Sequence, residues 1–235
     1  YYLDRDQIPF DENGEQDLET IDSIDVKGFN HDLELLLNGE AVEIPKFNFL
    51  TGKREYKGRK ITLSQSDIIV VEGIHGLNDT IGETVKQGMK FKIFISALTQ
   101  LNIDDHNRIP TSDTRFIWRL VRDVRHRGVD PATTIGMWTM VSKGEAQHIF
   151  PYQENADAMF NSALVYEMCI LKQYVEPLLF AIDKALPQYA EARRLLKFMY
   201  SFLTIPAEEV PANSILREFI GGVSFLFTKG VKLIL

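Results

Sequence analysis

The sequence has a single cysteine and no long apolar run, and both absences limit what the protein can be. Cys169 lies in the apolar stretch LVYEMCILK, which indicates a small hydrophobic residue in a reducing compartment rather than a nucleophile. No stretch reaches about 18 consecutive apolar residues, and the start YYLDRDQ lacks the basic-then-apolar layout of a signal peptide. We therefore expect a cytoplasmic protein that is neither exported nor inserted into a membrane.

Basic side chains are not in excess either. The 33 acidic residues outnumber the 26 lysines and arginines, and the net charge of -7 disfavours a general nucleic-acid binder, whose affinity depends on neutralising phosphates. The five histidines show no metal-ligand spacing and are interpreted as ordinary polar residues. Because the chain opens on a Tyr-Tyr pair without a methionine, we expect further sequence upstream.

A phosphate-binding loop of the form G-x-x-x-x-G-K-[ST] occurs nowhere in the sequence. The Gly-Lys pair in LTGKR fails the pattern because the upstream glycine is absent and Arg54 follows the lysine. Such a loop wraps the β- and γ-phosphates of a nucleotide and supplies a hydroxyl to magnesium. Without it, these residues alone should not hold ATP productively.

What is present suffices for a globular domain, since 235 residues with 45% apolar side chains can bury a core. Helices are predicted within the segment GFNHDLELLLNGE at 28–40 and at 114–128, 163–185 and 188–203, a β-hairpin within 41–63, and strands at 68–71, 90–98 and 158–160. Because every residue from Ile68 to Val71 is apolar and β-branched, we expect a strand buried on both faces of a parallel sheet, and 90–98 as a second one. The order predicts an α/β fold with ligands at the carboxyl ends of its strands.

One acidic residue falls at such a strand end. Glu72 closes the apolar run and precedes Gly73, so its carboxylate could hold magnesium or orient a water bound to it. A strand-end acid that merely faces solvent is an equal alternative. Asp67, at the opposite end of the strand, is given no catalytic role.

Arginines and aromatic residues supply the other candidates. Arg119 and Arg122 share a helical face and Arg127 ends that helix, which suits phosphate because guanidinium groups match its oxygens and keep their charge. An arginine helix alone is more often a solvated face paired with acids. Phe47 and Phe49 lie on the same side of a strand and could sandwich a flat base, although such a pair is more often core.

Taken in order up to about residue 165, these segments resemble the uridine kinase and phosphoribulokinase family. YYLDR resembles the continuation of Asp-x-[Phe/Tyr]-Tyr, and DLETIDSID resembles Phe-Asp-x-Pro-x-Ala-Phe-Asp. IPKFNFLTGKR is similar to the hairpin Pro-x-Tyr-Asp-Phe-x-x-His-x-Arg, and DIIVVEGIHGL to the strand ending Phe-Glu-Gly-Ile. RLVRDVRHRGVD resembles the lid helix Arg-x-x-Arg-Asp-x-x-x-Arg-Gly-Arg-Asp. The stretch FPYQENADAMFNSALVYE is similar to a bacterial branch of long uridine kinase-like proteins.

The resemblance implies an ATP-dependent kinase that uses Mg²⁺ and transfers the γ-phosphoryl group to the 5'-hydroxyl of a nucleoside. It implies that Glu72 is a magnesium-site acid, that Arg122 and Arg127 are lid arginines on the ATP phosphates, and that Arg119 lies near the acceptor. The residues implied for the nucleoside pocket are Tyr2, Asp22, Phe47 and Phe49, with Asp22 toward the ribose hydroxyls. Tyr2 as a frayed end and Asp22 as a turn or cap residue remain open alternatives.

The implied fold is that of a P-loop kinase similar to nucleoside monophosphate kinases, with a parallel sheet, flanking helices and the P-loop strand missing. Residues 1–186 would form the partial kinase domain and 187–235 a helical C-terminal extension, which could pack on the kinase core or against another subunit of a homo-oligomer. The aspartate that the family uses as a base would precede Tyr1 and is absent. We therefore expect this chain to be inactive alone.

The sequence also departs from the family pattern. Gly52 stands where the family has a pocket histidine, Val129 replaces the second lid arginine, and Phe47 and Asn48 replace Tyr-Asp. Loss of these polar groups removes direct recognition of a pyrimidine edge and puts uridine in doubt. A kinase for a sugar phosphate or another hydroxyl acceptor, or a non-catalytic regulatory module of the same fold, remains an alternative.

Overall fold

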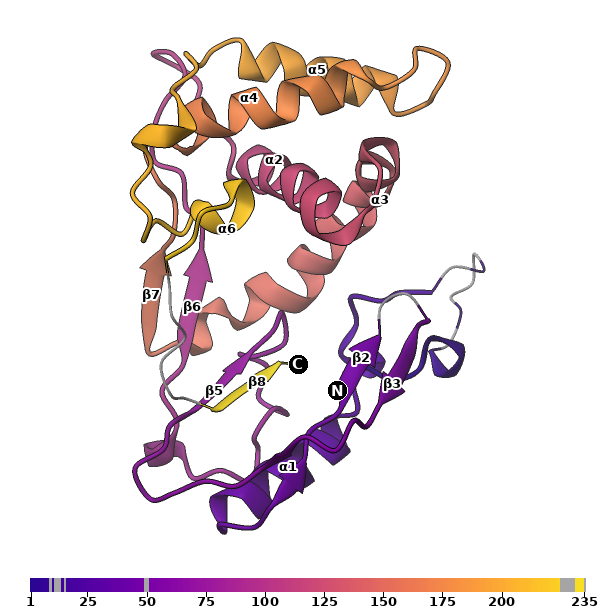
Figure 1. Ribbon diagram of the computed structural model, residues 1–235, viewed down its shortest axis with the longest axis vertical. Coiled ribbons are helices and arrows are strands. Elements are labelled where there is room, and N and C mark those ends of the chain that lie inside the picture. The colour runs from indigo at the N-terminus through magenta and orange to yellow at the C-terminus, as the bar shows by residue number, and fades with distance from the viewer. Residues whose placement is uncertain (9, 11–13, 15, 49–50, 225–230, 235) are drawn as a thin grey trace. The chain divides into compact units, whose positions relative to one another are not determined.

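The computed structural model describes residues 1–8, 10, 14, 16–48, 51–224 and 231–234, with backbone alone for the last range (Figure 1). Its chain contacts define two compact units. The first, called the hairpin unit, comprises residues 1–94, 143–159 and 227–235, and the second, called the helical unit, comprises 95–142 and 160–226. Each unit has its own cluster of buried apolar side chains.

The hairpin unit is built around helix α1, Val26–Leu37. Asp25 caps the helix, because its Oδ1 accepts a hydrogen bond from the Gly28 N–H at 2.9 Å. Phe29, Leu33 and Leu36 follow the predicted helical spacing and are buried in the core of this unit. The predicted helix is therefore confirmed, and it begins two residues before the segment in which it was predicted.

Short antiparallel strand pairs follow α1, as the alternating pattern predicted. Strand β2, Lys46–Asn48, pairs with β3, Lys53–Glu55, and Phe47 lies opposite Arg54 in this ladder. Strand β1, Val42–Glu43, pairs with β4, Lys60–Ile61, farther from the turn. The β-hairpin is thus confirmed, with β2 and β3 forming its end.

A parallel strand pair completes this unit. Strand β5, Ile69–Glu72, pairs in parallel with β8, Val231–Ile234, with Glu72 opposite Ile234. Ile69 and Val71 pack against the core, whereas Val70 on the other face is 51% exposed. Burial of the strand on both faces, expected from its unbroken apolar run, is wrong for the described residues, because only one face is covered there.

Strands β6, Ile93–Ser96, and β7, Ala158–Asn161, form a further two-stranded sheet. The two strands were predicted at 90–98 and 158–160. In β6, Phe94 and Ser96 are buried while Ile95 is 63% exposed, so the expected two-sided burial is wrong here as well. An apolar run marks a strand but does not reveal whether both of its faces are covered.

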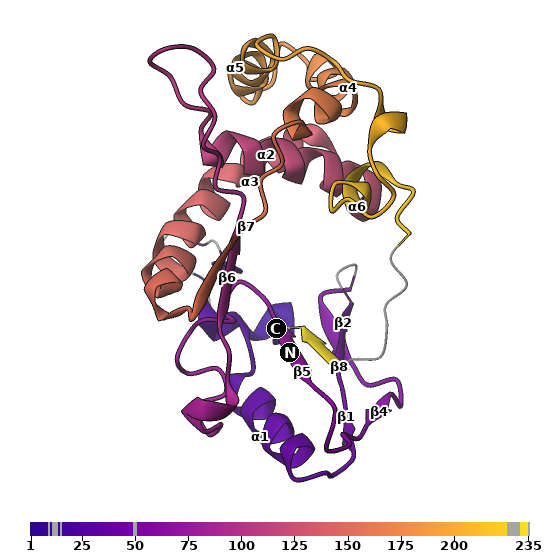
Figure 2. The same ribbon diagram turned by 90° about the vertical axis from the view of Figure 1, so that its left-hand side faces the viewer.

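The helical unit contains α2, Thr111–Arg122, and four further helices (Figures 1 and 2): α3, Pro131–Gly144, α4, Glu167–Phe180, α5, Tyr189–Met199, and α6, Arg217–Ile220. Figure 2 shows α4 and α5 side by side, and both contribute to one apolar core with α2. The predicted stripe of α2 is fully buried at Phe116, Ile117, Leu120 and Val121. Helix α3 was not predicted, and its last two residues belong to the hairpin unit.

The described parts give an α/β structure that contains helices and the parallel strand pair β5–β8. None of the helices in these parts is both long enough and apolar enough to span a bilayer. The expected boundary between residues 186 and 187 stays a prediction.

Candidate functional site

The structure places Glu72 at the carboxyl end of β5, as predicted, and its side chain is exposed. Among the described residues, no group of three or more His, Cys, Asp or Glu side chains could hold a metal ion. Mg²⁺ in nucleotide-dependent enzymes is commonly bound by one or two carboxylates together with waters and substrate phosphates. A single exposed carboxylate at a strand end is compatible with that kind of site.

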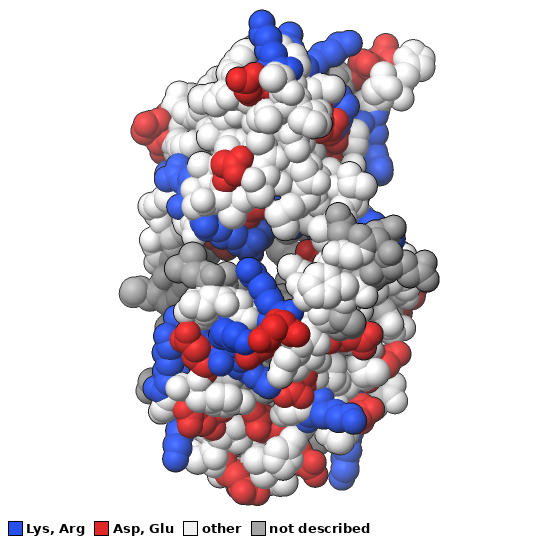
Figure 3. Space-filling model, turned by 90° about the vertical axis from the view of Figure 1, so that its right-hand side faces the viewer, with Lys and Arg blue, Asp and Glu red and all other residues white. Residues whose placement is uncertain are grey.

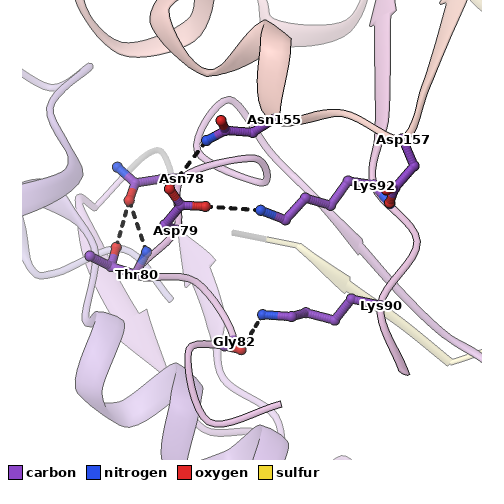
Figure 4. Close-up of polar contacts among 8 residues, drawn as sticks. All are labelled: Asn78, Asp79, Thr80, Gly82, Lys90, Lys92, Asn155 and Asp157. Atoms are coloured by element: carbon purple, nitrogen blue, oxygen red, sulfur yellow. Dashed lines mark hydrogen bonds and ion pairs between the residues drawn. The ribbon is translucent and has the colours of Figure 1, made fainter. Parts of the chain in front are cut away.

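The segment that follows Glu72 is held by a network of polar contacts within the hairpin unit (Figure 4). Asp79 accepts hydrogen bonds from Lys92 Nζ at 2.9 Å and from Asn155 Nδ2 at 3.2 Å. Lys90 Nζ donates to the Gly82 carbonyl at 2.9 Å. These contacts join residues 78–92 to the segment around Asn155, so the strand end that carries Glu72 leads into a braced loop.

A buried amide supports the same loop from α1. Asn30 Nδ2 donates to the Thr80 carbonyl at 2.8 Å, and its Oδ1 accepts from the Gly82 N–H at 2.7 Å. The side chain is buried on the helix face that also carries Phe29 and Leu33. A polar residue at a core position was not singled out from the sequence, although its place on the apolar face of the helix was a usable signal.

Two of the residues predicted for the acceptor pocket are in contact. The rings of Tyr2 and Phe47 have centroids 5.3 Å apart and are tilted by 58°. Tyr2 forms an isolated antiparallel bridge with Ile24, so three chain segments meet at this aromatic pair. Phe49, the other predicted aromatic residue, lies outside the described residues.

Asp22 lies two residues before the bridging position Ile24, in a short 3-10 turn. Its side chain is exposed, and its N–H donates to Thr20 Oγ1 at 3.4 Å. The backbone of Asp22 therefore lies in a turn, as one of the two interpretations predicted. The contact of its exposed carboxylate with the ribose hydroxyls stays a prediction.

Opposite Phe47 in the hairpin lies Arg54, which forms an ion pair that was not predicted from the sequence. Arg54 Nη1 lies 2.7 Å from Asp25 Oδ2, and the Arg54 N–H donates to Asp4 Oδ1 at 2.7 Å. Burial acts to raise the pKa of Asp25, but the hydrogen bonds from Arg54 and Gly28 outweigh it and lower the pKa overall. Arg54 fills the last position of the hairpin motif, and that match was a usable signal.

Gly52 has a left-handed backbone, with φ of 67°, at the turn between β2 and β3. Its carbonyl accepts a hydrogen bond from the Arg5 N–H at 3.0 Å. A Cβ atom at this glycine would lie 2.7 Å from Arg5 Cδ. The aliphatic part of Arg5 therefore occupies space that a side chain at position 52 would need.

The three predicted lid arginines meet on one buried carboxylate in the helical unit. Asp123 Oδ2 accepts from Arg119 Nε at 3.2 Å, and its Oδ1 accepts from Arg127 Nη1 at 3.3 Å. Arg122 Nε lies 3.5 Å from Asp123 Oδ1 as an ion pair. The structure thus brings together Arg119, Arg122 and Arg127 around Asp123, which was considered from the sequence only as an acid that could pair with this helix.

This arginine cluster carries more positive than negative charge. Three guanidinium groups surround one carboxylate, and burial lowers the pKa of Arg122, with repulsion from Arg127 and Arg119 adding to the effect and Asp123 opposing it. Arg122 Nε is buried and has no hydrogen-bond partner among the described residues. An anion bound here would gain attraction from all three cations.

The histidines differ in part from their interpretation as ordinary polar residues. His75 is only 1% exposed, three residues after Glu72, and its ring lies against that of His148. His126 Nε2 donates a hydrogen bond to the Glu218 carbonyl at 2.8 Å. On the face drawn in Figure 3, acidic and basic side chains are interspersed, in line with the modest net charge.

Comparison with known proteins gives a consistent result. The model of the Phosphoribulokinase / Uridine kinase family matches residues 11–167, about two thirds of the chain. A uridine kinase from Staphylococcus haemolyticus is 28% identical over 158 residues, which cover 67% of this chain and 68% of the relative. A uridine kinase from Clostridium botulinum strain Okra is 29% identical with the same coverage, and one from Deinococcus deserti is 27% identical over 57% of this chain and 56% of the relative.

Proposed function

The chain belongs to the Phosphoribulokinase / Uridine kinase family, and on this premise we propose that it is the acceptor-binding and lid part of an ATP-dependent nucleoside kinase. The observation that carries the proposal is the arginine cluster, where three guanidinium groups surround one buried carboxylate. Guanidinium groups are the side chains best suited to phosphoryl oxygens, because they are planar, always charged and able to donate two hydrogen bonds at once.

In the proposed reaction, Arg122 and Arg127 contact the ATP phosphates and Arg119 lies toward the acceptor. Phosphoryl transfer depends mainly on positioning and on neutralising charge that spreads over the phosphoryl oxygens. The arginines would supply that charge, and Glu72 would hold Mg²⁺. When bound, Mg²⁺ would neutralise part of the charge on the β- and γ-phosphates.

Tyr2, Asp22, Phe47 and Phe49 would bind the nucleoside. The contact between Tyr2 and Phe47 supports an aromatic surface for a base, and the exposed carboxylate of Asp22 is available to ribose hydroxyls. Apolar contacts to a base discriminate weakly between nucleosides, whereas hydrogen bonds to its edge discriminate strongly. We therefore propose a nucleoside acceptor without assigning uridine.

We further propose a P-loop kinase fold related to that of nucleoside monophosphate kinases, with residues 187–235 as a helical extension. The motif G-x-x-x-x-G-K-[ST] does not occur in the 235 residues, so these residues alone would not hold the β- and γ-phosphates productively. Turnover by this chain by itself is not expected.

A second acceptor class is favoured by one observation. Arg5 lies across Gly52, at the position where the family motif has a histidine, and this changes the hydrogen-bonding groups near the hairpin turn. A phosphorylated sugar or another hydroxyl acceptor would be the alternative substrate for such a site.

The test is a product assay. The gene product that contains these residues would be incubated with γ-labelled ATP, Mg²⁺ and a panel of ribonucleosides and sugar phosphates. We expect label in nucleoside 5'-monophosphates, with a large loss of product in Arg122→Ala and in Asp22→Ala. Labelled sugar bisphosphates would favour the second acceptor class, and no acceptor-dependent label in either group would contradict a kinase.

A further inference from the structure

Asp123 is the centre of the arginine cluster. The residue is 3% exposed, and both of its carboxylate oxygens are engaged. Its Oδ2 accepts hydrogen bonds from Arg119 Nε at 3.2 Å and from Thr134 Oγ1 at 3.5 Å. Its Oδ1 accepts a hydrogen bond from Arg127 Nη1 at 3.3 Å and lies 3.5 Å from Arg122 Nε. One buried acid therefore contacts side chains from α2, from the turn after it and from α3.

The backbone at the same residue brings Arg127 back to the carboxylate. Asp123–Arg127 form a π-helical turn at the end of α2, and the Asp123 carbonyl accepts hydrogen bonds from the N–H groups of Gly128 and Val129. Gly128 ends the turn with φ of 65°. Single π-helical turns are rare and occur often at functional sites. Asp123 thus fixes both the course of the chain and the directions of the arginine side chains.

Converging arginines are costly without an anion. Like charges repel, and each long side chain loses about 2 kcal/mol of rotamer freedom when it is fixed in one geometry. One carboxylate among three guanidinium groups offsets part of this cost and still leaves an excess of positive charge. A polyphosphate that binds such a site meets cations that are already oriented, which reduces the entropy lost on binding.

We propose that Asp123 is a positioning residue that holds Arg119, Arg122 and Arg127 together in the absence of nucleotide, so that a polyphosphate binds a preformed cationic site. The inference rests on the proposed function, because it assigns the cluster to phosphate. It concerns a residue that acts through the arginines and does not itself touch the ligand.

The direction in which one substitution changes the affinity for an anion distinguishes a positioning role from a simple effect of charge. Asp123→Asn removes a negative charge beside three cations, and electrostatics alone would then tighten the binding of an anion. Loss of positioning would weaken it. We expect weaker binding by about tenfold, which corresponds to the loss of one charge-assisted hydrogen bond.

The experiment uses the whole chain and inorganic tripolyphosphate, with affinity measured by calorimetry at a fixed ionic strength. Asp130→Asn is the matched control, because it makes the same change of charge seven residues away. Asp130 is exposed and accepts hydrogen bonds from the N–H and the hydroxyl of Thr133. Asparagine can keep the first of these as a helix cap. Exchange of the Arg119 Nε–H, measured by NMR, reports directly on positioning and should accelerate only in Asp123→Asn.

The outcomes are distinguishable. Weaker binding in Asp123→Asn, with Asp130→Asn equal to or tighter than wild type, supports the inference. Equal or tighter binding in Asp123→Asn overturns it while the phosphate site stands. Binding that is absent in wild type, or unchanged in Arg122→Ala, removes the phosphate site and the inference with it. If Asp123→Asn does not fold, Asp123→Glu keeps the charge and shifts the carboxylate, so weaker binding supports positioning and unchanged binding overturns it.

Discussion

The imidazole rings of His75 and His148 lie edge to face, with centroids 5.9 Å apart, inside the hairpin unit. Burial lowers the pKa of His75, positive charge on His148 lowers it further, and Asp17, which lies 3.8 Å from His148 Nε2, opposes the effect. The pKa of a histidine in an unfolded chain is about 6.5. Below that value the unfolded state binds more protons than the folded state, so acid should weaken this unit.

We predict that His75 contributes stability above about pH 6.5 that is lost as the pH falls through the lower pKa of the folded state. The measurement is urea unfolding of wild type and His75→Leu between pH 5 and pH 8, roughly the range over which histidine titrates. As the pH falls, the free energy of unfolding should decrease more in wild type than in His75→Leu. His31→Gln, at an exposed position on α1, is the control, and parallel curves for wild type and His75→Leu would contradict the prediction.

Glu167 should have the opposite pH dependence. Burial raises its pKa to about 7, although the Leu164 N–H donates to its Oε2 at 3.2 Å and acts against the shift. Because the folded state then binds more protons than the unfolded state, stability should fall as the pH rises from about 4.5 to about 7, by on the order of 3 kcal/mol at most. Glu167→Gln should remove this fall in an unfolding series.

Exposed Glu208 supplies the control for that series, since Glu208→Gln removes an acid at the surface of the same unit. Its unfolding free energy should follow that of wild type across the pH range. A wild-type curve that runs parallel to the Glu167→Gln curve would show that the buried acid does not titrate in this range.

Asn30 should be important for the stability of the loop after β5. In Asn30→Ala the Thr80 carbonyl and the Gly82 N–H lose their partner, and we expect a loss of about 2 kcal/mol in the free energy of unfolding. Glu34→Ala, at an exposed position of the same helix, should change it by less than about 0.5 kcal/mol. Equal effects of the two substitutions in urea unfolding would refute a special role for the amide.

Gly52 and Gly58 form a natural comparison, because both have positive φ, 67° and 73°. Alanine at either position should cost about 1–2 kcal/mol for the left-handed backbone. Only at Gly52 would the new Cβ meet another side chain, since nothing lies within 4 Å of the Cβ position at Gly58. Gly52→Ala should therefore be the more destabilising of the two in thermal unfolding.

The excess cost at Gly52 should come from Arg5, whose Cδ would lie 2.7 Å from the new Cβ. In an Arg5→Ala background the two glycine substitutions should then cost the same. If the difference persists without the Arg5 side chain, the contact with Arg5 is not its cause.

Regular spacing made part of this structure predictable. The stripe Phe116, Ile117, Leu120 and Val121 identified α2, because a helix that covers a core must place apolar residues three and four apart. Helix α3 was missed because its sequence PATTIGMWTMVSKG carries apolar residues, β-branched threonines and a glycine without a clear stripe. In such a segment the local sequence pattern says little about the secondary structure, which depends more on tertiary contacts.

The candidate site was predictable only where residues act through their own motif positions. The three lid arginines were found. Asp123 fills the acidic position of the same motif but was given no role, because its contact with Thr134 comes from another helix. Likewise, the burial of His75 depends on a segment more than 70 residues away in the sequence. Periodicity within one element carries no information about such partners.

The order of segments in the two units also governs how the protein can be divided. The chain passes from one unit to the other four times, at residues 94–95, 142–143, 159–160 and 226–227. A cut at any single peptide bond therefore leaves at least one unit assembled from two fragments. Cleavage after residue 186 would separate α5 from a core to which it contributes Ala192, Leu195, Leu196 and Met199, together with Arg194, which binds Asp113 through two hydrogen bonds. Complementation between the resulting fragments, rather than independent folding of either one, is the behaviour to expect from a chain threaded in this way.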